Sequence, residues 1–84
     1  MGGSAPIDDQ PAHLVDAVGL TCPMPVLMAR KALRDLPGGA VVELRASDPL
    51  ARIDIPHFCA QNGHVLLDRT ESGGVLVFRL RKSG

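Results

Sequence analysis

Hydrophobic positions repeat along the chain with two different periods, and these periods predict an alternation of strands and helices. Apolar residues recur at helical spacing over Val26–Leu36, which predicts a helix. Pro37 and two glycines follow directly and are expected to end it. On either side of this helix, His13–Ala17 predicts a short strand, and the alternation of apolar and polar residues over Ala40–Ala46 predicts a second, half-buried strand.

The second half of the chain predicts another helical region, which proline interrupts. Asp48 has the residue type of a helix N-cap, and Pro49 suits the first position of a helix. Because Pro56 breaks the pattern farther on, we expect one helical turn from Pro49 and then a separate helix over Asp54–Asn62. Asp54 is expected to cap this second helix.

Two more strands complete the predicted elements. They span His64–Thr70 and Val75–Lys82, and the pair Gly73–Gly74 between them is typical of a β-hairpin turn. The last strand is expected to send alternate apolar residues into the core: Leu76, Phe78 and Leu80.

The order strand, helix, strand, helix, strand, strand indicates the α/β class. Two helices and four strands of these lengths predict a two-layer sandwich, with both helices on one face of a four-stranded mixed sheet. The 84 residues suffice for one small domain. We expect that domain to cover residues 13–82, with residues 1–12 as a flexible N-terminal tail and residues 83–84 as a short C-terminal tail.

Composition narrows the classes of function. Nine Lys and Arg residues balance nine Asp and Glu residues, so the net charge gives no reason to expect nucleic acid or a membrane as a direct partner. Two Phe residues, with no Trp or Tyr, leave almost no platform for stacking bases. No apolar run approaches the ~20 residues of a membrane span, and the first residues do not form a signal peptide. We therefore expect a cytoplasmic protein that is a monomer when free.

The two cysteines stand in different settings. Cys22 follows a glycine-led loop and precedes the first predicted helix, whereas Cys59 falls inside the second helical region and is interpreted as a buried core residue. Two cysteines without a Cys-x-x-Cys pair cannot make a disulfide framework, which favours a reducing compartment. Cys22 is therefore the candidate for chemistry.

The residues around Cys22 predict an accessible thiol. Pro23 and Pro25 are expected to stiffen the start of the helix and to hold Cys22 and Met24 extended, with the thiol toward solvent. Because the positive end of a helix dipole stabilises an anion, we expect the pKa of this thiol to lie below its ordinary value of about 8.5. Three basic residues farther along the helix are expected to add to this effect: Arg30, Lys31 and Arg34.

A single activated thiol suits a carrier of chemical groups. No histidine pattern ties an imidazole to Cys22, as a cysteine hydrolase would need, and no neighbouring cysteine could resolve a disulfide. Sulfane sulfur is a natural cargo, because a persulfide is a reversible state of cysteine. A zinc site built from His57, Cys59 and His64 is disfavoured, because residues two apart on a helix point in different directions.

The segment DAVGLTCPMPVLMARKAL, from Asp16 to Leu33, resembles the signature of the TusA/SirA family of small sulfur carriers. In that signature a strand and a short Gly-Leu loop lead to Cys-Pro-x-Pro at the start of a helix. The segment ASDPLARIDIPHFCAQNGH resembles the second helical region of the same family, and VFRLRK its last strand. The resemblance extends from Leu14 to Lys82.

The resemblance implies a sulfurtransferase that acts as a sulfur carrier without a cofactor or metal, and it implies a role for each motif residue. Cys22 would be the nucleophile that bears a persulfide, supported by the rest of the motif: Gly19, Leu20, Pro23 and Pro25. The sulfur donor would be a cysteine desulfurase or a rhodanese-like protein, and the acceptor a downstream sulfur-relay protein. Transfer RNA thiolation, sulfur oxidation and cofactor assembly are among the pathways of such carriers. Six residues would be candidates for contacts with these partners: Met24, Arg30, Lys31, Arg34, Asp48 and Asp54.

Two alternatives to a carrier stay open at this point. The same fold could serve as a regulatory module that binds RNA or protein without covalent chemistry. A thiol enzyme that reduces peroxide or exchanges disulfides would need Cys59 next to Cys22 as a resolving partner. Thr21 and Val18 stand where many family members carry basic residues, so the partner is expected to differ from that of the family's namesake.

Overall fold

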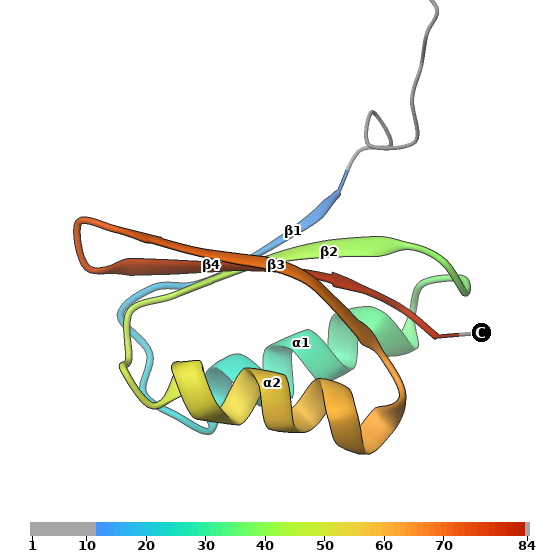
Figure 1. The fold of residues 1–84 in the computed structure, drawn as a ribbon, viewed down its shortest axis with the longest axis horizontal. Helices are drawn as coiled ribbons and strands as arrows, with labels where there is room; N and C mark the ends of the chain where they lie inside the picture. The colour runs from blue at the N-terminus through green and yellow to red at the C-terminus, as the bar shows by residue number, and fades with distance from the viewer. Residues whose placement is uncertain (1–11, 84) are drawn as a thin grey trace, which may run out of the picture.

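The computed structural model describes residues 12–83 and shows two helices packed against one face of a four-stranded sheet (Figure 1). The elements follow one another as β1 (His13–Ala17), α1 (Met24–Arg34), β2 (Val41–Ala46), α2 (Ala51–Asn62), β3 (Val65–Ser72) and β4 (Val75–Arg81). The predicted β-α-β-α-β-β order and the two-layer α/β sandwich are therefore confirmed.

The sheet is mixed, with the strand order β1-β2-β4-β3. β1 runs parallel to β2, whereas β4 lies antiparallel to both β2 and β3. Leu44 lies opposite Val15 on one side and Phe78 on the other, so alternate apolar residues of neighbouring strands share the face toward the helices. Because β1 and β2 are parallel, the loops that leave them toward α1 and α2 lie at the same edge of the sheet.

The hydrophobic core fills the space between the two layers. The sheet contributes Val15, Ala17, Val42, Leu44, Ala46, Leu76, Phe78 and Leu80, and the helices contribute Ala29, Leu33, Ala51, Ile55, Phe58 and Cys59. A fully buried side chain of the size of leucine or phenylalanine contributes about 1.5–3 kcal/mol. The core therefore holds both helices at fixed positions on the sheet, and with them the loops at their N-terminal ends.

α1 begins at Met24 and ends at Arg34, two residues earlier at each end than predicted. Pro23 is its N-cap and Pro25 lies in the first turn, where the missing N–H of proline would have had no carbonyl partner. The first turn thus accommodates Pro25 without displacing the residue before it. Met24 is helical, and the expectation that it is extended is wrong.

α2 is one continuous helix over Ala51–Asn62, so the predicted interruption at Pro56 is wrong. Pro56 lacks the N–H that would bond to the carbonyl four residues earlier, which costs the helix one hydrogen bond. Ile55 and Phe58 lie close to it in the chain and are buried in the core. Their packing against the sheet offsets the missing bond and keeps the helix intact.

The turn between β3 and β4 confirms the predicted hairpin. Gly73 and Gly74 have φ angles of 58° and 83°. A two-residue turn with positive φ at both positions twists in the same sense as the strands it joins, and glycine adopts it without strain.

The predicted N-terminal tail, residues 1–12, lies outside the described residues except for Ala12, and residue 84 of the predicted C-terminal tail lies outside them as well. Within residues 12–83, neither helix is long and apolar enough to cross a membrane.

Candidate functional site

Cys22 lies where two loops meet at one edge of the sheet. Its backbone N–H, in the loop between β1 and α1, donates a hydrogen bond to Oδ2 of Asp48 in the loop between β2 and α2 at 2.8 Å. The N–H of Gly19 donates to Oγ of Ser47 at 2.8 Å, and Gly19 has a φ of 87°, which favours glycine. These two hydrogen bonds tie the loops together and fix the backbone on which the thiol is mounted.

The Cys22 side chain is half-buried rather than turned fully toward solvent. One part of it packs against the edge of the hydrophobic core, and the remainder stays accessible. The peptide bond between Cys22 and Pro23 is cis. The half-buried side chain is open to a visiting molecule, although it is less exposed than predicted.

Asp48 joins the two loops instead of capping α2. The N-cap of α2 is Leu50, which makes no side-chain capping hydrogen bond, and Asp54 lies in the first turn, so the expectation that these aspartates are caps is wrong. Oδ1 of Asp48 accepts the N–H of Leu50 at 3.0 Å while Oδ2 accepts the N–H of Cys22. These two hydrogen bonds lower the pKa of Asp48 below its ordinary value.

The pKa of the Cys22 thiol is raised to about 11, so the expectation that it is lowered is wrong. Burial against the core is the largest cause, a hydrogen bond from the thiol to the carboxylate of Asp54 is the next, and the negative charges of Asp54 and Asp48 add to both. The positive end of the α1 dipole is outweighed because two carboxylates from another part of the chain face the thiol. Such a thiol is almost entirely protonated at pH 7.

The lowered pKa of Asp48 predicts a loss of stability in acid. Its contribution is fully present above the ordinary pKa of aspartate, about 3.9, and is lost as the pH falls through the lower pKa of the folded protein. We expect Asp48→Asn to reduce the dependence of the unfolding free energy on pH below about pH 4, measured by urea denaturation. Asp35→Asn, an exposed position at the other end of α1, is the matched control and should keep the wild-type dependence. An unchanged dependence in Asp48→Asn would contradict the expectation.

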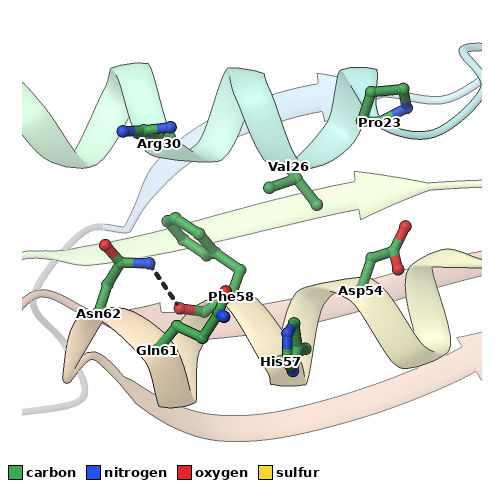
Figure 2. Close-up of a pocket in the computed structure, with 8 residues that line it drawn as sticks. All are labelled: Pro23, Val26, Arg30, Asp54, His57, Phe58, Gln61 and Asn62. Carbon is green, nitrogen blue, oxygen red and sulfur yellow. Dashed lines mark hydrogen bonds between the residues drawn. The ribbon is translucent and has the colours of Figure 1, made fainter.

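A groove of about 420 Å³ runs between α1 and α2, and Pro23, the residue after Cys22, lines one end of it (Figure 2). It is lined on one side by Pro23, the N-cap of α1, and by Val26 and Arg30 of that helix. The other side is formed by residues of α2: Asp54, His57, Phe58, Gln61 and Asn62. Figure 2 shows Val26 and Phe58 facing each other across its middle, with the Asp54 carboxylate directed toward α1 at the Pro23 end and Arg30 at the opposite end. Its two ends therefore carry opposite charges on either side of an apolar centre.

Comparison with known proteins assigns the chain to a family. A family model described as Sulfurtransferase TusA matches residues 13–82. The chain belongs to the TusA sulfurtransferase family.

Individual relatives agree with this assignment. Sulfur carrier protein TusA of Pseudomonas fluorescens (strain SBW25) is 44% identical over 69 residues, which cover 82% of this chain and 83% of that protein. Sulfur carrier protein TusA of Pseudomonas entomophila (strain L48) is 46% identical over 68 residues, which cover 81% of this chain and 85% of that protein. The crystal structure of the SirA-like protein from Desulfitobacterium hafniense is similar with a TM-score of 0.75 and 26% identity, over 84% of this chain and 97% of that one.

The structure brings some of the predicted site residues of this TusA family member together and separates others. Met24 follows Cys22 by two residues, and Asp48 accepts the N–H of Cys22. Arg30 and Asp54 line opposite ends of the groove. Lys31 instead lines a second hollow, between α1 and β1, and Arg34 lies in the last turn of α1. The groups that shift the thiol pKa are acidic, in contrast to the expected contribution from the basic residues of α1.

Sequence reasoning missed most of the α2 wall of the groove. His57, Phe58, Gln61 and Asn62 follow Asp54 at intervals of three, four, seven and eight residues, which is the spacing of one helix face. The predicted helix over Asp54–Asn62 carried this signal, but nothing in the sequence indicates that the face looks toward α1 and the thiol.

Cys59 is buried, as predicted. Only 3% of it is exposed, and burial raises the pKa of its thiol. Because a visiting peroxide or disulfide cannot reach it in the folded protein, Cys59 is poorly placed to act as a resolving thiol for Cys22. Among residues 12–83, no group of three or more His, Cys, Asp or Glu side chains is arranged to hold a metal ion.

Proposed function

We propose that the protein is a cytoplasmic sulfur carrier that accepts sulfane sulfur as a persulfide on Cys22 and passes it to a downstream sulfur-relay protein. The observation that carries the proposal is the contrast between the two thiols. Cys22 is accessible at the junction of two hydrogen-bonded loops, whereas Cys59 is sealed in the core. Membership of the TusA family supports the same role.

The proposed loading step is a thiol exchange that needs no cofactor. The deprotonated sulfur of Cys22 attacks the outer sulfur of a persulfide on the donor protein, a cysteine desulfurase or a rhodanese-like protein. A new S–S bond forms on Cys22 while the S–S bond of the donor breaks. The donor cysteine leaves as a thiolate and takes up the proton that Cys22 lost, so no oxidant or reductant is consumed.

Exposed apolar side chains around Cys22 support docking of such a protein. Large hydrophobic residues in the two loops and in the first turns of both helices are exposed by 38–68%: Val18, Leu20, Met24, Leu50 and Ile53. An exposed apolar patch on a small protein is typical of a surface that contacts another protein. Together with Met24, the charged residues Arg30, Lys31, Arg34, Asp48 and Asp54 remain the proposed partner contacts.

The proposal is tested by intact-mass measurement after incubation with a cysteine desulfurase and L-cysteine. We expect a gain of about 32 Da, the mass of one sulfur atom, which a reducing thiol removes again. Proteolysis under non-reducing conditions should place the added sulfur on the peptide that contains Cys22. Folded protein that gains no sulfur from a desulfurase or from a rhodanese-like donor would overturn the proposal.

A further inference from the structure

The proposed function requires the thiol of Cys22 to react. Its surroundings in the free protein, however, favour the protonated and less reactive form. The charged groups that face Cys22 are Asp48 from the loop before α2 and Asp54 from α2 itself. Arg30 of α1, the cation of the groove, lies about two turns beyond Pro23, roughly 10 Å along the helix. The thiol therefore meets two negative charges at short range and a positive one only at a distance.

The two aspartates act on Cys22 through different contacts. Asp48 binds the backbone N–H of Cys22 and that of Leu50, so both of its oxygens are engaged in holding the loops. Asp54 instead acts on the thiol itself: it lines the groove together with Pro23, the residue after Cys22, and it raises the pKa of the thiol. Asp54 is thus the group whose removal should change the chemistry of the sulfur without dismantling the junction of the loops.

Asp54 has no cationic partner among the described residues. The ion pairs within residues 12–83 join Arg45 to Glu43, Arg52 to Glu71, and Arg79 to Asp68. The carboxylate of Asp54 is half-buried and points into the groove, next to its apolar centre. A partly desolvated carboxylate at the mouth of an open groove favours a cation supplied from outside.

We propose that Asp54 holds Cys22 as a neutral, unreactive thiol in the free protein, and that a sulfur-transfer partner activates it by placing a cationic side chain against Asp54 in the groove between α1 and α2. The choice of partner rests on the proposed function. A cation at this position takes up the charge of Asp54, weakens its hold on the thiol hydrogen and stabilises the thiolate. The carrier then reacts when docked and is protected from oxidants and stray electrophiles between encounters.

The first test measures the rate at which iodoacetamide alkylates Cys22, followed by peptide mass spectrometry as a function of pH. Iodoacetamide is neutral and reacts with the thiolate, so its rate reports ionisation of Cys22. We expect Asp54→Asn to move the profile to lower pH and to raise the rate at pH 7 by roughly threefold for each pKa unit, because the gain in thiolate is partly offset by its weaker nucleophilicity. Asp35→Asn removes the same charge far from the thiol and should leave the profile of the wild type unchanged. Asp54→Ser provides a second variant should Asp54→Asn lose its fold.

The second test asks whether the groove selects positive charge. Methanethiosulfonate reagents with a trimethylammonium group and with a sulfonate group present opposite charges to the same thiol. We divide the ratio of the cationic to the anionic rate by the same ratio measured with a free thiol. We expect this normalised ratio to be several-fold above one in the wild type and in Asp35→Asn, and to fall in Asp54→Asn to the smaller value that Asp48 alone maintains. A normalised ratio of one in the wild type, or a ratio that does not change on loss of Asp54, would overturn the inference.

These tests need no sulfur donor, so they separate the inference from the proposed function. A protein that gains sulfur on Cys22 while its alkylation ignores Asp54 keeps the proposed function and overturns the inference. Conversely, a thiol that responds to Asp54 in both tests but never acquires sulfur supports the inference about the free thiol and overturns the carrier function.

Discussion

Replacing Cys22 with serine is expected to abolish sulfur loading completely. Serine keeps the size of the side chain and the backbone N–H that donates to Asp48, so the junction of the loops should survive. A hydroxyl cannot form a persulfide, and the variant should therefore show no gain in mass after incubation with a cysteine desulfurase and L-cysteine.

Cys59→Ser is the matched control for this variant. Cys59 lies in the core with 3% of its surface exposed, so its thiol should contribute no loading, and the variant should gain one sulfur atom as the wild type does. Because serine places a hydroxyl in an apolar site, this control is compared after its fold has been checked by circular dichroism. A sulfur adduct on Cys22→Ser would contradict the assignment of the thiol.

The same pair of variants separates a carrier from a module that only binds. A regulatory protein that acts through contacts alone should keep its effect after Cys22→Ser, because the fold and the apolar patch are unchanged. A carrier should lose its effect in that variant and keep it in Cys59→Ser. The comparison can be made in cells that lack the native protein, with the thiolated product of the pathway as the readout.

Replacing Phe78 with alanine is expected to cause the largest loss of stability of any single change in the core. Phe78 is fully buried in β4, opposite Leu44 of β2, and it faces the helices. Truncation of a buried phenylalanine costs about 3–5 kcal/mol. A domain of this length has a free energy of unfolding of roughly 4–13 kcal/mol, so the variant should lose a large share of its stability.

Val77→Ala is the control for this prediction. Val77 is the neighbouring residue of β4, points away from the helices and is only half-buried. Its truncation should cost about 1 kcal/mol or less. Urea denaturation of both variants gives the comparison, and equal losses of unfolding free energy would mean that the helix-facing side of β4 does not form the core.

Most of the fold could be predicted from local patterns. The period of two in β4 predicted that Phe78 faces the core, and the structure pairs it with Leu44 of β2 on the same face. The glycine pair of the β3–β4 turn was recognisable because only residues tolerant of positive φ fit it. At Pro56 and Met24 a local rule of proline chemistry was overruled by packing or by position within a helix. The expectation that Asp48 and Asp54 are caps was wrong because α2 begins at Ala51, between them.

The sequence by itself determined which residue is the reactive candidate, since proline spacing and the helical pattern after Cys22 are properties of adjacent residues. Only the tertiary structure decided how that thiol behaves. The parallel pairing of β1 and β2 brings the loop with Asp48 against Cys22. The packing of α2 beside α1 places Asp54 in the same groove as Pro23, where its charge raises the pKa of the thiol. Electrostatic effects depend on distance through space, so carboxylates from distant parts of the chain reverse the shift that the helix dipole alone would produce.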